Sequence, residues 1–407
     1  MDFAESTKYL LSLGNEVSAM KLGLENIRTL LAALDDPQNN FLKVQVAGTN
    51  GKGSVCAFLD SMCVRAGIKT GLFTSPHLIS ITERIKIGGV EISEADFALH
   101  ATRVREICEL RVAKGELEAI PTFFEQITAI ALSVFAEEEI ELAILETGLG
   151  GRLDATTAAN AEIVAITQID YDHQEYLGDT LVEIAAEKAA IIRSDTKVVV
   201  AKQKREAELV IRGRCREAGV EPNFAKSNYP NVVLGLLGKH QQANAAVAIA
   251  IVQELRELNF IIPDDKMRTG LETARHPGRL EYFENFLFDG AHNIAGASAL
   301  REYLDEFVKQ PITMIFGAMK GKDAGEIASV LFPKIEILIL TKPENTRALE
   351  AAEILNMIPD QGLKKVVLTG NVAEAIKIAR EVYAPDGLIC VTGSLYLVGE
   401  AKKILNN

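Results

Sequence analysis

The clearest sign of chemistry in the sequence is a glycine-rich loop that carries one lysine. Residues 44–54 read Val-Gln-Val-Ala-Gly-Thr-Asn-Gly-Lys-Gly-Ser. The apolar run at its start predicts a strand, and a helical pattern follows it. A loop between a strand and a helix directs several backbone N–H groups to one point at the positive end of the helix dipole, and the lysine adds a mobile cation. The pattern therefore predicts a phosphate site built from Thr49, Asn50, Gly51, Lys52, Gly53 and Ser54.

This loop departs from the strict phosphate-loop pattern at two positions. Val46 stands where the first glycine of the pattern belongs, and Gly53 rather than Ser or Thr follows Lys52. The alternative interpretation is an ordinary strand–turn–helix whose glycines serve packing. Spacing alone leaves both interpretations open.

Polar residues follow three other predicted strands. Glu146 comes directly after the apolar run 142–145, His173 follows the run 163–169, and Ser75 follows 70–73. Because the carboxyl ends of parallel strands share one edge of a sheet, these oxygen and nitrogen groups are expected to lie together, and such ligands suit Mg²⁺. The alternatives are a turn-capping role for the glutamate and a structural role for the histidine.

Several more polar residues stand at positions that suit either function or structure. Lys188 lies in a largely apolar helical segment, so it is either at the solvent edge of that helix or functionally buried. Asn244 opens an alanine-rich helical pattern, Asp289 ends an apolar run, and Arg279 follows a Pro-Gly pair. Their structural alternatives are a helix cap, an Asp-Gly turn and a surface charge.

Short apolar runs alternate with longer helical patterns along most of the chain. This alternation predicts an α/β fold, with a mononucleotide-binding parallel sheet flanked by helices and a smaller C-terminal α/β, Rossmann-like domain. Pro277-Gly278 marks the predicted boundary between domains 1–276 and 277–407, with the active site in the cleft between them. Helices are predicted in the first forty residues and at 123–135 and 181–192. Strands are predicted at 44–47, 70–73, 142–145, 163–167, 198–201, 286–289, 312–316, 335–341, 366–369 and 388–392.

Composition narrows the class of protein. The chain has 407 residues, of which 48% are hydrophobic and 24% charged, which suits a globular enzyme of two domains. A net charge of −13 argues against a protein that mainly binds nucleic acid, and no apolar run is long enough to span a membrane. The five cysteines are scattered and the start lacks a signal-like pattern, so we expect a cytoplasmic protein, acting as a monomer.

Taken together, these motifs resemble those of folylpolyglutamate synthase and dihydrofolate synthase, the folate members of the Mur ligase superfamily. The resemblance covers nearly the whole chain. It rests on the ordered segments 23–27, 48–54, 74–78, 82–85, 146–156, 172–173, 187–188, 240–241, 277–281, 289–293 and 392–396.

The resemblance implies an ATP-dependent ligase that joins L-glutamate to dihydropteroate, to reduced folates, or to both, through an acyl phosphate. It implies ATP and two Mg²⁺ ions as cofactors, with Ser75, Glu146 and His173 as metal ligands, and Lys188 carbamylated by CO₂. Lys52, Lys188 and His173 would be catalytic. By the same resemblance Asn244, Arg279 and Asp289 contact ATP, in addition to the glycine-rich loop. The implied substrate contacts are Thr122, Phe123, Phe124, Glu125, Leu153, Asp154, Ala155, His292 and Ser394.

Three residues depart from the family pattern, namely Thr157, Ala190 and Gly321. None of them is a proposed metal or phosphate ligand, but Thr157 lies beside the implied pterin site and leaves the preferred folate open.

Two other classes of protein compete with this interpretation: a Mur ligase for peptidoglycan precursors, and a nucleotide-binding protein without catalysis.

Overall fold

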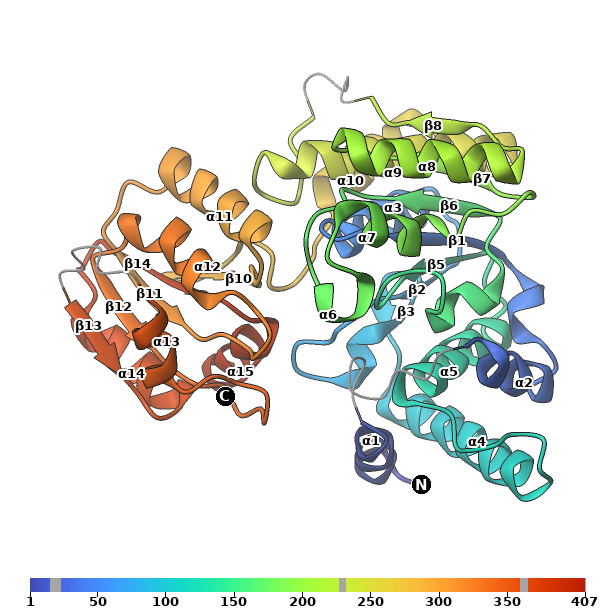
Figure 1. The fold of residues 1–407 in the computed structure, drawn as a ribbon, viewed down its shortest axis with the longest axis horizontal. Coiled ribbons are helices and arrows are strands. Elements are labelled where there is room, and N and C mark those ends of the chain that lie inside the picture. The colour runs from blue at the N-terminus through green and yellow to red at the C-terminus, as the bar shows by residue number, and fades with distance from the viewer. Residues whose placement is uncertain (15–22, 227–231, 359–364, 407) are drawn as a thin grey trace. The chain divides into compact units, whose positions relative to one another are not determined.

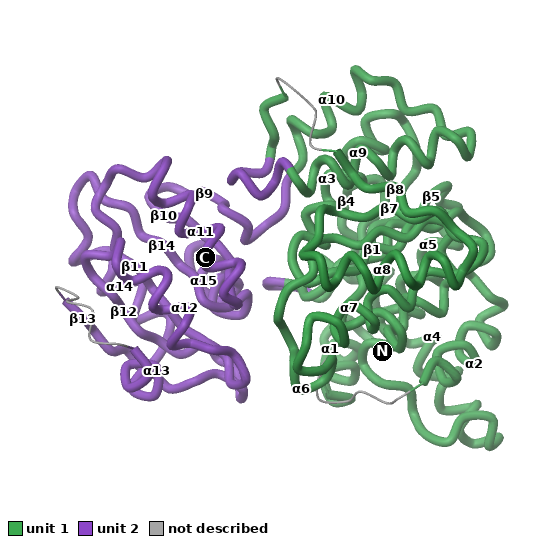
Figure 2. Tube along the Cα trace, turned by 45° about the horizontal axis from the view of Figure 1, so that its top comes forward, with its two compact units in different colours: residues 1–77, 81–235, 243–274 green, residues 78–80, 236–242, 275–407 purple. Residues whose placement is uncertain are grey.

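The protein forms two compact units in the computed structural model, which describes residues 1–14, 23–226, 232–358 and 365–406 (Figure 2). The first unit consists of residues 1–77, 81–235 and 243–274, and the second of residues 78–80, 236–242 and 275–407. Each unit has its own sheet with flanking helices, which confirms the predicted α/β fold. The division at residue 277 and the catalytic cleft stay predictions.

The N-terminal segment is helical, as the apolar period predicts. It forms α1 (Phe3–Ser12), α2 (Glu25–Ala33) and the short η1 (Pro37–Asn40). Asp2 and Glu5 close the start of α1 with a capping box, which satisfies backbone N–H groups that a helix start leaves open. Residues 15–22, which belong to the same prediction, lie outside the described residues.

The first unit is built on a sheet with the strand order β4-β3-β2-β5-β1-β6-β7-β8. Its central strands are parallel, while β3 and β4 pair antiparallel at one edge. Every strand predicted in this half of the chain is present, and the three others are too short or too polar to show a pattern. The bounds are β1 Leu42–Ala47, β2 Thr70–Phe73, β3 Ile85–Ile87, β4 Val90–Glu91, β5 Leu142–Glu146, β6 Ile163–Ile166, β7 Lys197–Val200 and β8 Pro222–Phe224.

Helices cover both faces of this sheet (Figure 1). One apolar cluster joins α5 to β2 and β5, and another joins α7 and α8 to β6 and β7. The prediction of one helix over 181–192 was wrong at its end, because α7 ends at Ala189 and the chain turns there to enter β7. The helices are α3 Lys52–Arg65, η2 Ile81–Arg84, α4 Glu94–Ala113, α5 Phe123–Glu137, η3 Ala155–Ala159, α6 Gln174–Leu177, α7 Leu181–Ala189, α8 Arg205–Ala218, α9 His240–Glu257 and α10 Asp264–Thr273.

The second unit is built on a sheet with the order β13-β12-β11-β14-β10-β9, in which only β9 pairs antiparallel. Its buried strands alternate their side chains between two apolar clusters, one with α11 to α13 and one with α14 and α15. Because both faces are covered, the strands read as continuous apolar runs in the sequence. The elements are β9 Glu281–Phe283, β10 Phe286–Asp289, α11 Ile294–Phe307, β11 Ile312–Phe316, α12 Ala324–Leu331, η4 Phe332–Lys334, β12 Ile337–Leu340, α13 Ala351–Met357, β13 Lys365–Leu368, α14 Val372–Val382, β14 Leu388–Thr392 and α15 Leu395–Leu405.

Within residues 1–14, 23–226, 232–358 and 365–406, no helix combines the length and the apolar character that crossing a membrane requires.

Candidate active site

Four neighbouring parallel strands of the first sheet end at the same edge. The order β2-β5-β1-β6 is continuous, and the register pairs Phe73 with Leu145, Val46 with Glu146 and Ala47 with Ile166. The segments that follow these strands therefore begin side by side. They carry Ser75, the glycine-rich loop and residues 167–173, while Glu146 is the last residue of β5, as expected for a site at the carboxyl ends of an open α/β sheet.

The glycine-rich loop connects β1 to the first turn of α3. Its first residue, Gly48, has φ of 151° and a Cβ added there would lie 1.8 Å from Thr167 Oγ1, so only glycine fits. Gly51 caps α3 with φ of 89°. Lys52 Nζ folds back along the loop and donates to the carbonyls of Gly48 at 3.2 Å and Thr49 at 3.4 Å. The lysine thus lies over the loop that the sequence assigns to phosphate.

Thr49 and Asn50 join this loop to the segment after β6. Their backbone N–H groups both donate to the carbonyl of Gln168, at 3.0 and 3.2 Å. The Thr49 hydroxyl donates to the Asp170 carbonyl and accepts from the Asp170 N–H, each at 3.0 Å. These two residues hold the loop in place, and their predicted contact with phosphate stays a prediction.

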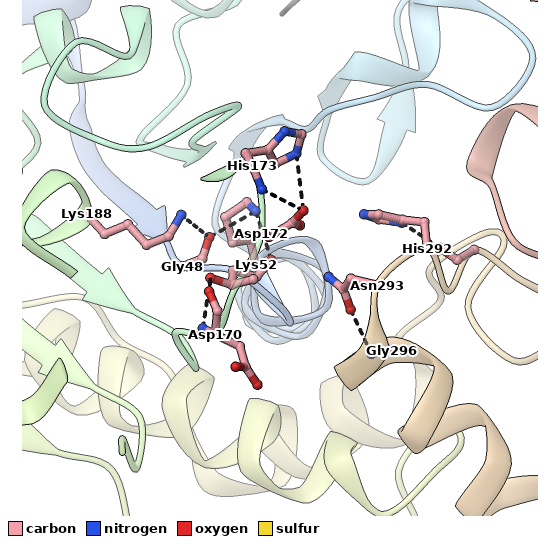
Figure 3. Close-up of polar contacts among 11 residues, drawn as sticks. Gly48, Lys52, Asp170, Asp172, His173, Lys188, His292, Asn293 and Gly296 are labelled. Carbon is pink, nitrogen blue, oxygen red and sulfur yellow. Dashed lines mark hydrogen bonds and ion pairs between the residues drawn. The ribbon is translucent and has the colours of Figure 1, made fainter. Parts of the chain in front are cut away.

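Lys188 is buried, with 4% of its surface exposed, which excludes the solvent-edge alternative. Its Nζ donates to the Gly48 carbonyl at 2.9 Å, the same oxygen that Lys52 contacts (Figure 3). Burial, and secondly the charge of Lys52, lower the pKa of Lys188 from 10.5 to about 7. The structure thus places an easily deprotonated amine directly behind the glycine-rich loop.

Ser75 and Glu146 are brought together by a hydrogen bond, in which the Ser75 N–H donates to Glu146 Oε2 at 3.1 Å. Glu146 is 6% exposed. The pKa of the buried Cys56 thiol, in the second turn of α3, is raised first by burial and then by the charge of Glu146. A buried carboxylate oxygen at a phosphate loop fits a hard cation such as Mg²⁺.

His173 lies with Asp172 in the segment between β6 and α6. The His173 N–H donates to Asp172 Oδ1 at 2.9 Å, and its Nε2 lies 3.8 Å from the same oxygen (Figure 3). The charge of Asp172 also opposes the lowering of the Lys188 pKa, so this carboxylate acts on Lys188 as well as contacting His173. In the part of the chain that the structure describes, no three His, Cys, Asp or Glu side chains are grouped to hold a metal ion, so the predicted metal set stays a prediction.

The predicted acceptor segment 122–125 begins α5. Thr122 and Glu125 form a capping box, with the Thr122 N–H and hydroxyl donating to Glu125 Oε2 at 2.7 and 2.8 Å. Phe123 is buried beneath Arg84, whose guanidinium lies 5.2 Å from the ring centroid. Phe124 faces the loop after β5 so closely that a Cβ at Gly148 would lie 2.6 Å from the ring. The structure therefore joins this segment to the loop that leads from Glu146 to Asp154.

That loop is held from below by a buried amide. Gln45, on β1, donates from Nε2 to the hydroxyls of Thr156 at 2.9 Å and Thr157 at 2.8 Å. The Thr156 hydroxyl donates to Asp154 Oδ1 at 2.5 Å, and the Thr157 hydroxyl donates to the Gly151 carbonyl at 2.7 Å.

Burial raises the pKa of Asp154, while hydrogen bonds from Thr156 and the Leu149 and Gly148 backbone oppose that rise. Leu153 and Ala155 flank this carboxylate in the chain.

Asn244 lies against the glycine-rich loop in the first unit, where its Oδ1 is 2.2 Å from the position of a Cβ added to Gly51. This close approach links the N-terminal part of α9 to the start of α3, and the predicted contact of Asn244 with ATP stays a prediction.

The remaining predicted residues belong to the second unit. Asp289, His292 and Ser394 lie at or just after the carboxyl ends of β10 and β14, whereas Arg279 precedes β9. Asp289 ends β10 and accepts from the N–H groups of Leu280 and Ala291, both at 3.0 Å. Burial raises the pKa of Asp289, and the nearby Arg279 charge counters this. His292 Nδ1 lies 2.8 Å from the Gly290 carbonyl, and Ser394 caps α15 just after the adjacent strand β14. These contacts fix the residues and leave their predicted ligands untested.

The sequence interpretation gave no role to three polar residues near these segments. Gln45 contacts Thr156 and Thr157, Gln203 contacts Thr167 and Ile169, and Asp172 was noted only as part of the segment 172–173. Asp172 had a usable signal, since it neighbours the candidate histidine at a strand end. The two glutamines had none, because a glutamine in a strand or loop is usually exposed.

Comparison with known proteins agrees with this geometry. Residues 46–252 match the family described as the Mur ligase middle domain, and residues 278–395 match the Mur ligase glutamate ligase domain. The chain is 32% identical to the dihydrofolate synthase/folylpolyglutamate synthase of Bacillus subtilis, with 95% of each chain covered. The chain belongs to the folylpolyglutamate and dihydrofolate synthase family of Mur ligases.

Other members of the Mur ligase family are similar over the full chain. A probable bifunctional folylpolyglutamate synthase/dihydropteroate synthase of Haloferax volcanii is 33% identical over 99% of this chain, which spans about half the length of that relative. The folylpolyglutamate synthase of Mycobacterium tuberculosis, solved with ADP and AMPPCP, has a TM-score of 0.91 at 29% identity, and 100% and 99% of the two chains are covered. A bifunctional folylpolyglutamate synthase/dihydrofolate synthase of Yersinia pestis, solved with AMPPNP and Mn, has a TM-score of 0.86 at 25% identity, with 100% and 98% of the two chains covered.

Proposed function

We propose that this chain is an ATP-dependent ligase that joins L-glutamate to a pteroate-type or folate carboxylate and releases ADP and phosphate. The observation that carries the proposal is the convergence of the glycine-rich loop, Glu146 and the buried Lys188 at one edge of the first sheet. Relatives with this fold bear the names of folylpolyglutamate and dihydrofolate synthases. We further propose that both acceptors, dihydropteroate and reduced folates, are used.

The residue types suit the activation of a carboxylate. A carboxylate is a poor acyl donor, and transfer of a phosphoryl group from ATP converts it into an acyl phosphate that the glutamate amine can attack. Lys52, at the start of α3, would neutralise charge on the phosphoryl group as it moves. Glu146 and Ser75, with His173, would hold Mg²⁺, which lowers the charge of the phosphates when it is bound.

Lys188 would act as its carbamate. Only the neutral amine reacts with CO₂, and a pKa of about 7 makes that form abundant near neutrality. Carbamylation would turn a cation beside Lys52 into an anion suited to a second Mg²⁺. Thr49 to Ser54 would bind the phosphates, while Asn244, Arg279 and Asp289 would contact the rest of ATP.

The acceptor would lie along residues 122–125 and 153–155, and we propose that glutamate contacts involve His292 and Ser394. The close contact between Phe124 and Gly148 supports a single acceptor site. It joins the segment 122–125 to the loop that leads to residues 153–155, and both lie within one unit. We propose a catalytic cleft between domains 1–276 and 277–407.

We also propose a cytoplasmic monomer that binds neither membranes nor nucleic acid. All five cysteines are buried and unpaired, which suits a reducing compartment. The net charge of −13 disfavours binding to phosphate backbones. Light scattering of the purified chain, with and without substrates, tests the monomer.

The decisive experiment measures ADP release with L-glutamate and either dihydropteroate or a reduced folate as acceptor. ADP release that needs both glutamate and an acceptor supports the ligase. Release with a nucleotide-sugar precursor alone would assign a peptidoglycan Mur ligase instead. Nucleotide binding without turnover on any acceptor would assign a binding protein.

A further inference from the structure

Gln203 lies in the short segment between β7 and α8 and is 9% exposed. Its side-chain amide makes two hydrogen bonds to the segment that follows β6. Nε2 donates to the Thr167 carbonyl at 2.8 Å, and Oε1 accepts from the Ile169 N–H at 3.0 Å. One side chain therefore satisfies a backbone acceptor and a backbone donor of the same segment.

This amide continues the sheet beyond the end of β7. The strands β6 and β7 pair up to Ile166 and Val200, and the Ala201 N–H then donates to the Ile166 carbonyl at 2.8 Å. Past that point the backbone of 201–204 leaves the sheet, and the Gln203 amide supplies the next donor and acceptor. Without it, two buried backbone groups would lose their partners, which is costly for a folded chain.

The same segment holds the glycine-rich loop on its other side. The Thr167 N–H donates to the Ala47 carbonyl at 2.8 Å, and the Gln168 carbonyl accepts from Thr49 and Asn50. Residues 167–170 are thus held between Gln203 and the glycine-rich loop. They lead directly to Asp172 and His173, so a shift of this segment would displace groups on both sides of the candidate phosphate site.

We propose that Gln203 is a positioning residue for nucleotide binding, which acts by holding residues 167–170 against the glycine-rich loop. The inference rests on the proposed function, in which the nucleotide is ATP. Lys204 adds an ion pair with Asp170 at 2.8 Å, but this lysine is exposed and such pairs contribute little. The buried amide is therefore the main constraint on this side.

The test is Gln203→Leu, which keeps a similar size and removes both hydrogen bonds. Isothermal titration with Mg·ADP should give a Kd about tenfold higher than that of the wild type or more, as expected for loss of a hydrogen-bonded constraint. In steady-state ligation, KM for ATP should rise in parallel, while KM for the folate acceptor should stay within about twofold of the wild-type value.

Two control variants separate positioning from stability. Lys43→Met removes a buried side chain that donates to the carbonyls of Gln38 at 2.8 Å and Phe41 at 3.1 Å, near the opposite, amino-terminal end of β1. It should lower Tm and leave the Kd for Mg·ADP unchanged. Lys202→Ala, at the exposed neighbour of Gln203, should alter neither quantity.

The proposal would be overturned if Gln203→Leu bound Mg·ADP with the wild-type Kd. It would also be overturned if Lys43→Met, at a Tm equal to that of Gln203→Leu, raised the Kd by the same factor. If Gln203→Leu does not fold, Gln203→Glu keeps the acceptor for Ile169 and loses the donor to Thr167, and a wild-type Kd in that variant overturns the proposal equally. A wild-type chain that binds Mg·ADP but ligates no acceptor would defeat the proposed function and leave this binding test intact. A wild-type chain that does not bind Mg·ADP would overturn the inference itself.

Discussion

Lys188→Met should stabilise the protein most at neutral pH and progressively less as the pH rises. The pKa of this amine is 10.5 in the unfolded chain. In the folded protein its pKa is about 7, because the cation is buried. Between these values unfolding takes up one proton, so the lysine's penalty on stability is largest at pH 7 and below and is relieved as the pH rises towards 10.5. Methionine has no proton to exchange and a similar length.

The magnitude follows from one proton per molecule. The uptake of one proton on unfolding changes the free energy of unfolding by about 1.4 kcal/mol per pH unit. Between pH 7 and 9, the free energy of unfolding of the wild type should therefore rise by about 2–3 kcal/mol relative to that of the variant. The same pKa leaves about half of the amine neutral at pH 7, against about one part in 3,000 for a lysine of ordinary pKa. Both quantities depend on the burial of Nζ, which donates a hydrogen bond to the Gly48 carbonyl.

Urea unfolding at pH 7, 8 and 9 in CO₂-depleted buffer measures the difference in unfolding free energy between the two proteins. Lys202→Met, at an exposed position, is the matched control and should show a constant difference. Addition of ¹³C-bicarbonate should then produce a carbamate signal in NMR spectra of the wild type and none in Lys188→Met, which should also lose ligation. Parallel pH dependence in wild type and variant would refute the burial argument, and a ¹³C signal that persists in the variant would refute the carbamate.

Three further substitutions test neighbouring parts of the site. Lys52→Ala should lower turnover about 10²-fold or more with little change in Tm, because the side chain contacts loop carbonyls rather than the core; a near-normal rate would remove the phosphate-loop assignment. Glu146→Gln should raise the Mg²⁺ concentration needed for half-maximal ligation, since an amide is a weaker ligand, and an unchanged Mg²⁺ requirement with a lowered Tm would make Glu146 structural. Gly148→Ala should destabilise by about 1–3 kcal/mol and raise KM for the acceptor, because the added methyl lies 2.6 Å from the Phe124 ring; Phe124→Leu in the same chain should recover Tm, and denaturant unfolding checks both.

Sequence patterns predicted ten of the strands because each of these reads as an apolar run, and all ten except the exposed edge strand β13 are largely buried. The strands β3, β4, β8 and β9 were not predicted, since they are two or three residues long and partly exposed at or next to sheet edges. The end of α7 was also misplaced, because Ala190 to Ile192 continue a helical pattern that the turn into β7 interrupts. Local propensity does not report such tertiary demands.

The candidate site could be predicted to the extent that strand ends mark it. Glu146 and Lys52 stand where a strand or a glycine loop ends, so their types and places were readable. The burial of Lys188 was not, because a lysine on an apolar helix satisfies two opposite interpretations until its contacts are known. The contacts of Gln45 and Gln203 depend on segments more than thirty residues away, and no spacing rule connects them.

The bonds from Thr49 and Asn50 to Gln168 make the glycine-rich loop inseparable from the segment after β6. If a stretch equivalent to 46–54 were transplanted from an ATP-using protein, it would lack the segment that its backbone N–H groups bond. The side chain at position 167 would also clash with any residue larger than glycine at position 48. Such a graft should therefore include residues 166–170 and position 203. The structural unit that holds this loop is thus a set of three chain segments rather than one motif.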